Sequence, residues 1–251
     1  MAAYWVAAIG AGIGVLAGIV GAGPSILTVL LLERAGGLQL GSAIVTSLVV
    51  VALMSLVALI PYARAGAVLW RAAAGFGLAS MAGAYLGGRV STLIPASILL
   101  VIFLLAMVAA AIAMLWERPP PPEPEPRRRL RDVAVLAVAG LLVGSLTGLV
   151  GLGGGFAVVP LLVLFAGAPV RSAVGTSILV IAMNTLAALA GHFPHLPVDW
   201  RVAAYLGISE SAGSLVGARV AGHVGAGALR RAFAGIMLAA AVFMLGSALL
   251  R

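Results

Sequence analysis

The chain has 251 residues, of which 63% are hydrophobic and 9% are charged, and its mean hydropathy is +1.21. Because a soluble domain has roughly 25% charged residues, this composition predicts an all-α integral membrane protein with spans of about 20 residues. The absence of cysteine excludes disulfides and thiolate metal sites. The net charge of +8 argues little for nucleic acid as a partner, because five of the 15 arginines cluster in one linker, where we expect them to set orientation or contact lipid headgroups.

The chain begins with a long apolar stretch, roughly residues 4–32, which a glycine-rich block interrupts. The block reads Gly-Ile-Val-Gly-Ala-Gly-Pro-Ser over 18–25, and a second block, Gly-Leu-Val-Gly-Leu-Gly-Gly-Gly, occupies 148–155 within the stretch 132–166. Glycine is costly in a helix interior, and about 30 helical residues reach about 45 Å, which is too long for one simple span. Each first segment is therefore predicted to be a broken helix or a re-entrant hairpin.

A proline-rich, charged stretch divides the chain in two. It begins at Glu117, continues through four consecutive prolines and ends in an arginine cluster, a composition typical of an extended, solvated linker. We therefore expect a first transmembrane repeat over 1–116, a cytoplasmic linker over 117–131 and a second transmembrane repeat over 132–251. The apolar segments that follow the first one in each half are roughly 40–60, 70–90 and 95–116, and then 170–191, 200–221 and 228–250.

The two halves match each other at an offset of 130 residues. Pairing 14–90 with 144–220 without a gap gives 30 identities in 77 positions, whereas random pairing of this composition would give roughly a tenth. The shared residues include block glycines, Thr-Ser pairs and a tryptophan. The sequence thus predicts two homologous halves of about four hydrophobic segments each.

The course of the first segment decides how the halves are oriented. If it crosses the membrane, each half has four spans and the halves are parallel; if it returns, each half has three spans and the halves are inverted. With the linker inside, the parallel arrangement has 9 arginines inside and 6 outside, and the inverted one has 11 inside and 4 outside. Because cytoplasmic loops carry the excess of positive charge, this count favours the inverted repeat.

Backbone and hydroxyl groups are the candidates for binding a small anion. A helix broken by glycines exposes N–H groups, and the positive end of a half-helix attracts an anion, although small residues also serve close helix packing. Hydroxyls donate without adding charge, although in membrane helices they also bond to their own helix. The candidate substrate-binding residues are Gly21, Gly23, Ser25, Thr46, Ser47, Gly151, Gly153, Gly154, Gly155, Thr176, Ser177 and Asn184.

Glu210 is the carboxylate that stands in the middle of an apolar segment. Ionisable groups inside a membrane are costly and mark functional sites, so Glu210 is a candidate carrier of a coupling proton or a partner for an arginine. Arg89 and Arg219 occupy matching helix ends, where they attract an anion or extend to the headgroups. No catalytic pair, phosphate loop or metal-ligand set is apparent, so we expect no enzyme, no cofactor and no metal.

The sequence resembles the TauE/SafE family of membrane transporters, the sulfite and organosulfonate exporters. The resemblance is carried by Gly-Leu-Val-Gly-Leu-Gly-Gly-Gly-Phe-Ala-Val-Val-Pro at 148–160, Ala-Val-Gly-Thr-Ser at 173–177, Val-Asp-Trp at 198–200 and the duplication. It implies secondary transport of a small sulfur-containing anion across a bacterial inner membrane. The family's glycine motif falls on Gly151, Gly153, Gly154 and Gly155, and Pro160 closes it.

The first half departs from this family pattern. It has Pro24 and Ser25 where the second half has glycines, and Leu69 stands where the second half has Asp199. The expected partners are a small anionic substrate and the lipid bilayer, and a homodimer is left open. An anion channel and a non-transporting membrane enzyme or assembly subunit are the alternative functions.

Overall fold

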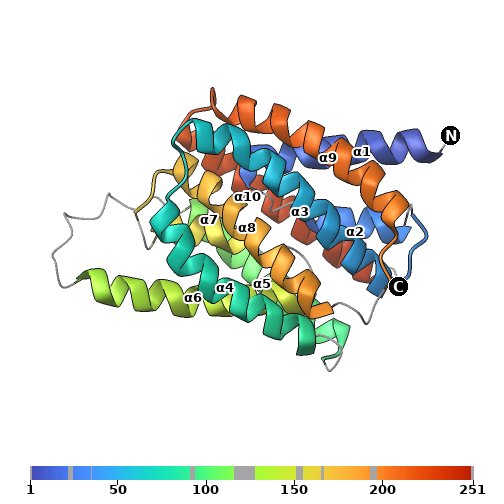
Figure 1. Cartoon of the computed structure of the whole chain (residues 1–251), viewed down its shortest axis with the longest axis horizontal. Helices are drawn as coiled ribbons and strands as arrows, with labels where there is room; N and C mark the ends of the chain where they lie inside the picture. The colour runs from blue at the N-terminus through green and yellow to red at the C-terminus, as the bar shows by residue number, and fades with distance from the viewer. Residues whose placement is uncertain are drawn as a thin grey trace.

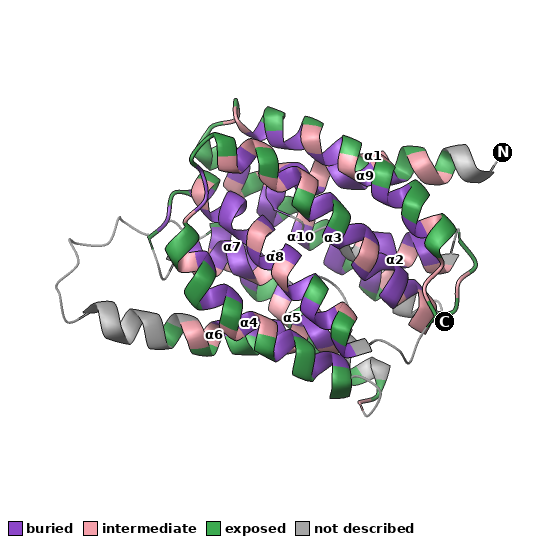
Figure 2. Cartoon of the chain, in the orientation of Figure 1, coloured by how far each residue is buried: buried purple, intermediate pink, exposed green. Residues whose placement is uncertain are grey.

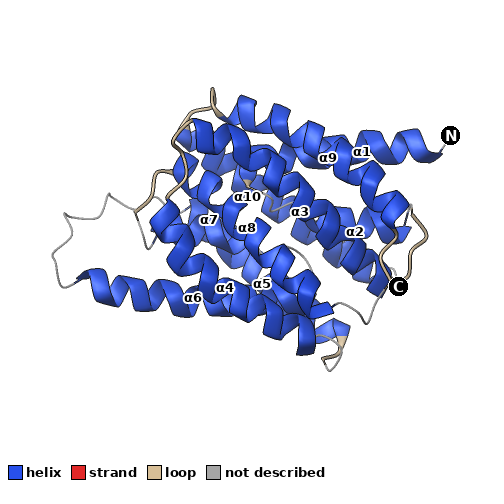
Figure 3. Ribbon diagram, viewed as in Figure 1, coloured by secondary structure: helices blue, strands red, loops and turns tan. Residues whose placement is uncertain are grey.

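The computed structural model describes residues 2–21, 25–34, 36–90, 94–115, 128–150, 155–164, 167–192 and 197–249. Within these ranges every regular element is a helix (Figure 3), which confirms the predicted all-α fold. Three stretches in the described residues are long and apolar enough to cross a membrane, Gly41–Arg64, Val170–Gly191 and Ala226–Gly246. The helices are α1 (Ala2–Val20), α2 (Ser25–Arg34), α3 (Leu40–Arg64), α4 (Trp70–Val90), α5 (Ala96–Leu115), α6 (Arg128–Val150), α7 (Gly155–Leu164), α8 (Val170–His192), α9 (Trp200–Ala221) and α10 (Ala226–Leu249).

The first apolar segment of each half is a broken helix. α1 ends at Val20 and α2 begins at Ser25, both within the first glycine block, and α6 ends at Val150 and α7 begins at Gly155 within the second block. Gly21, directly after α1, has φ +85, a left-handed conformation that costs a residue with a side chain roughly 1–2 kcal/mol. α6 begins at Arg128, inside the range predicted as linker, because arginine is a good helix former.

Figure 1 shows that the bundle has two ends. We call the end where α5 ends and α6 begins the linker end, and the end where α1 begins and α10 ends the terminal end. Leu69, just before α4, donates its N–H to the Thr176 hydroxyl in α8 at 2.9 Å, and Asp199, just before α9, donates its N–H to the Thr46 hydroxyl in α3 at 3.1 Å. α4 and α8 therefore start at the linker end, whereas α3 and α9 start at the terminal end.

Helices from the two halves pack together through glycines. α1 lies along α9, and α6 lies along α4. Gly14 of α1 lies against the backbone carbonyl of Glu210, and Gly144 of α6 lies against that of Ser80, so a Cβ atom at either glycine would collide with the facing backbone. Such contacts let two helix backbones approach closely, and they mean that the first helix of each half packs on the other half.

The bundle has a buried interior and an apolar outer surface. Buried residues face inward, whereas exposed residues follow the outer faces of α4, α6 and α9 (Figure 2). Many exposed side chains are large and apolar, including Ile208, which is 73% exposed, and Val242, which is 70% exposed. Water disfavours so much exposed apolar surface, and a lipid environment does not, so the surface suits a helix bundle embedded in a bilayer.

Candidate functional site

A buried carboxylate connects α9 to the short helix that follows the first break. The Thr28 hydroxyl in α2 donates to Glu210 Oε1 in α9 at 2.8 Å, and both side chains are 0% exposed. Glu210 Oε2 is buried too, and it has no hydrogen-bond partner among the described residues. One carboxylate oxygen is thus held by the protein, and the other is available to carry a proton.

A neutral polar pair occupies the corresponding position between α4 and α8. Ser80 stands 130 residues before Glu210, and its hydroxyl accepts a hydrogen bond of 2.7 Å from Asn184 Nδ2. Both residues are buried, and Asn184 Oδ1 has no partner in the part of the chain that the structure describes. The two positions therefore differ in chemistry, because the one on α9 carries an ionisable group and the one on α4 does not.

The first glycine break meets a hydroxyl from the other half. An ideal Cβ atom on Gly21 would lie 2.5 Å from Ser177 Oγ of α8, so these two predicted site residues are neighbours. The Ser177 hydroxyl donates its proton to Val174 O of its own helix over 2.8 Å, so binding an anion requires it to rotate away from that carbonyl. Ser25 is the first residue of α2 and Gly155 the first of α7. Gly23, Gly151, Gly153 and Gly154 lie outside the described residues.

The Thr-Ser pairs lie at opposite ends of the bundle. Thr46 and Thr176 are buried, and each accepts the N–H of the residue that precedes a helix of the other half. Thr176 Oγ1 also donates to Ser172 O at 2.6 Å, and Ser47 Oγ donates to Ile44 O at 2.7 Å. These hydroxyls have structural partners, and their role as anion ligands stays a prediction.

A pocket of about 320 Å³ opens at the linker end. The ends of α3 and α9 and the start of α8 form it. Arg219, one of the two predicted anion-attracting residues, lines this pocket, whereas Arg89 lies at the terminal end with its guanidinium 5.6 Å from the centroid of the Tyr85 ring. The lining residues are Pro61, Tyr62, Arg171, Ala218, Arg219, Gly222 and His223.

Sequence reasoning missed several of these residues. Thr28 is a lone hydroxyl in an apolar stretch, and its counterpart in the second half is Val158, so the repeat gave no signal for it. Arg171 and His223 join the pocket only because α8 starts where α9 ends. The sequence places Asp199 in the Val-Asp-Trp motif, and the structure shows that it caps α9 by accepting the N–H groups of Arg201 and Val202.

Together, the all-helical bundle, its apolar outer surface and its candidate spans define a polytopic membrane protein. The sequence model of the family described as "Sulfite exporter TauE/SafE" matches residues 6–244. The chain therefore belongs to the TauE/SafE family of membrane transporters, as the resemblance predicted.

Two relatives support this membership. A "Probable membrane transporter protein" of Xylella fastidiosa strain 9a5c is 33% identical over 237 residues, which cover 93% of this chain and 91% of that protein. "Probable membrane transporter protein YunE" of Bacillus subtilis is 34% identical over 93 residues, 34% of either chain. No solved structure matches this chain at a significant level.

Proposed function

We propose that the protein is a secondary transporter that exports a small sulfur-containing anion, such as sulfite or an organosulfonate, across the bacterial inner membrane, and that it is not an enzyme. Family membership and the transporter names of the relatives support transport as the activity. The family description supports the sulfur oxyanion as substrate.

The hydrogen bond between Thr28 and Glu210 is the observation that supports coupling of anion transport to proton transfer. It joins Glu210, a buried ionisable group, to α2, the short helix that starts at the glycine break. A charged carboxylate accepts a stronger hydrogen bond than a neutral one. Protonation of Glu210 therefore weakens the attachment of α2 to α9, and anion binding at the break and proton binding at Glu210 influence each other reciprocally.

For the anion site we propose the first glycine break beside Ser177, with the second block as its counterpart. Backbone N–H groups at the broken helix, and the Ser177 hydroxyl once it has rotated away from Val174 O, donate to an oxyanion without a fixed positive charge. The proximity of Gly21 to Ser177 supports this proposal. A site with little net charge also lets the anion leave again, which a transport cycle requires.

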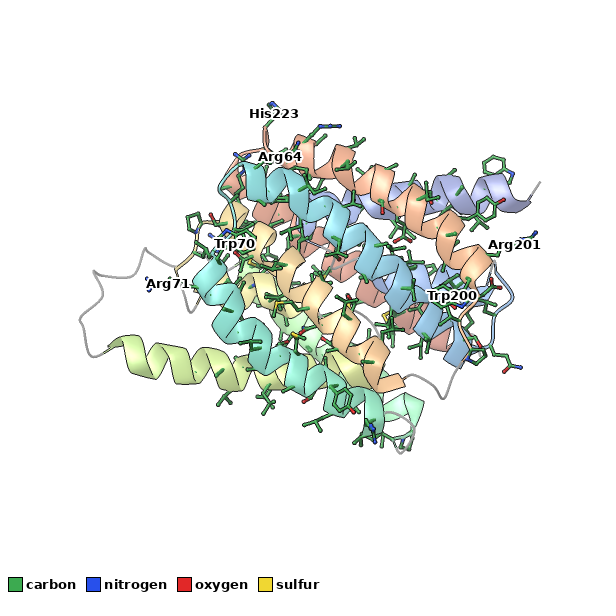
Figure 4. All side chains as sticks on the ribbon, in the orientation of Figure 1. Arg64, Trp70, Arg71, Trp200, Arg201 and His223 are labelled. Atoms are coloured by element: carbon green, nitrogen blue, oxygen red, sulfur yellow. The ribbon has the colours of Figure 1, made fainter. Side chains whose placement is uncertain are left out.

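We also infer that the halves form an inverted repeat whose linker end faces the cytoplasm. α3 and its counterpart α8 run in opposite directions (Figure 1). Trp70 and Trp200, which begin α4 and α9, lie at opposite ends (Figure 4), as expected for anchors at the two membrane interfaces. The described arginine side chains favour the same orientation: Arg64, Arg71, Arg171, Arg219, Arg230 and Arg231 belong to the linker end, and Arg89 and Arg201 to the terminal end.

The test is sulfite counterflow in proteoliposomes. Vesicles loaded with sulfite should take up radiolabelled sulfite transiently above its equilibrium level, with saturation at high external concentration. Unsaturable flux without counterflow would indicate the channel alternative, and the absence of any flux of sulfite, sulfoacetate or other short sulfonates would refute the proposed substrate class.

A further inference from the structure

The pocket at the linker end combines positive charges that the mechanism above does not use. Arg171 at the start of α8 and Arg219 at the end of α9 both line it, together with His223. The Arg171 and Arg219 side chains are exposed, and no carboxylate among the described residues forms an ion pair with either guanidinium. Two guanidiniums at one concave site, without a paired carboxylate in the part of the chain that the structure describes, make a surface that attracts anions.

The pocket lies next to the broken helix. Its lining residue Tyr62 is 2% exposed, and the Tyr62 hydroxyl donates to the Gly18 carbonyl of α1 at 2.7 Å. Gly18 lies one helical turn before Gly21. Ala218, another lining residue, also contacts this part of α1, because a Cβ atom on Gly18 would lie 2.8 Å from the Ala218 backbone nitrogen. The buried wall of the pocket is therefore the packing that surrounds the end of α1.

Of Arg171, Arg219 and His223, only Arg219 has a basic counterpart in the first half. At the offset of 130 residues, the counterparts of Arg171 and His223 are Gly41 and Leu93. Arg219 has Arg89 as its counterpart, but the Arg89 guanidinium stacks over the Tyr85 ring instead of lining this pocket. The basic residues of the pocket thus come from the second half, whereas Pro61 and Tyr62 come from the first. Figure 4 shows His223 at the linker end.

We infer that this pocket is a docking site for the anionic head group of the substrate, a sulfonate or sulfite, before the anion reaches the glycine break. The inference rests on the proposed function for the identity of its ligand. Arg171 and Arg219 hold the oxygens of the head group, and Tyr62 forms the wall between this site and the interior. Docking at the linker end raises the local anion concentration there, which favours loading of the anion from that side of the membrane.

The absence of cysteine in the chain permits a direct test in purified, detergent-solubilised protein. His223→Cys introduces a single thiol into the pocket. The thiol is then treated with 2-sulfonatoethyl methanethiosulfonate, which is itself an organosulfonate, or with its trimethylammonium analogue. In each case the thiolate displaces methanesulfinate and forms a mixed disulfide. Each rate is divided by the rate of that reagent with free 2-mercaptoethanol.

The anionic reagent should show the higher normalised rate. Adding Arg171→Gln and Arg219→Gln should lower the anion-to-cation ratio about three- to tenfold, as expected for unit charges acting across a partly hydrated pocket. The single arginine variants, tested separately, should give intermediate ratios. The matched control, Arg89→Gln in the same background, should leave the ratio unchanged. Methanesulfonate should protect the thiol in the parent background and fail to protect it in the double arginine variant.

An anion-to-cation ratio that does not change when both arginines are replaced would overturn the docking site, whatever transport assays show. Equal protection by methanesulfonate with and without the arginines would overturn it as well. If the ratio and the protection behave as expected while sulfite counterflow is absent, the docking site stands and the proposed transport function fails. The two failures are therefore distinguishable.

Discussion

Thr28 and Glu210 are 182 residues apart in sequence, and their side chains form a buried hydrogen bond of 2.8 Å. Each comes from a different half of the chain. The bond ties a short helix that starts at a glycine break to the helix that carries the buried carboxylate. The second carboxylate oxygen, Glu210 Oε2, has no hydrogen-bond partner among the described residues.

Thr28→Val should destabilise the protein. Valine keeps the shape of threonine but removes the donor, so both oxygens of the buried Glu210 carboxyl lack a described partner, at a cost of about 1–3 kcal/mol. The matched control is Thr147→Val, because the Thr147 hydroxyl bonds only to its own helix at Val143 O. Thermal unfolding in detergent measures both, and an equal loss in the two variants would contradict a special role for Thr28.

Glu210→Gln should abolish the pH dependence of transport while substrate exchange continues. Glutamine keeps an acceptor oxygen for Thr28 but cannot carry an exchangeable coupling proton. Sulfite flux in proteoliposomes is measured with and without an imposed pH gradient. Asp199→Asn serves as the control, since Asp199 caps α9 outside the bundle interior and its amide variant should retain the response to the gradient. A pH response that survives in Glu210→Gln would exclude this residue as the proton carrier.

Gly14→Ala should disrupt the packing of α1 on α9. An added methyl group meets the backbone of Glu210, and overpacking of this kind typically costs about 1–3 kcal/mol. Gly12 lies on the same helix with nothing within 4 Å of an added Cβ atom, so Gly12→Ala should raise stability by up to about 1 kcal/mol. Thermal unfolding and the yield of folded protein separate the two, and similar behaviour of both variants would argue against the close approach.

Thr176→Val should lower stability, because it removes the acceptor for the Leu69 N–H at the start of α4. An unpaired backbone donor costs about 1–3 kcal/mol when buried. Thr176→Ser, which keeps the hydroxyl, is the control. Sulfite affinity measured on the same variants tests the additional role as an anion ligand. A loss of affinity in Thr176→Val without any loss of stability would indicate that binding, and not capping, is the main task of the hydroxyl.

The broken helices could be predicted because glycine blocks leave a clear signal in an apolar sequence. Glu210 could be identified for a similar reason, since a carboxylate stands out among apolar neighbours. Thr28 could not, because one more hydroxyl in a membrane helix usually bonds to its own backbone, and nothing in its surroundings indicates a distant partner.

The linker-end pocket was also beyond sequence reasoning. Arg171 and Arg219 are separated by most of α8 and nearly all of α9, and only the opposite directions of these helices bring their ends together. The arginine count favours the inverted arrangement, but such a count indicates only on which side of the membrane each loop lies. It does not indicate which helices pack together. The packing of α1 on the second half and of α6 on the first half likewise depends on long-range contacts that no local sequence pattern encodes.

The pairing of α1 with α9 has a consequence for biosynthesis. α1 ends at Val20, whereas its partner α9 is completed only at Ala221. The glycine-lined face of α1 therefore lacks its final partner while α2 to α8 are synthesised, whereas α4 lacks α6 only while α5 and the linker are synthesised. Quality control in the membrane must tolerate this unpaired helix, and a chain truncated before α9 should be recognised as unfinished and degraded even though its first half is complete.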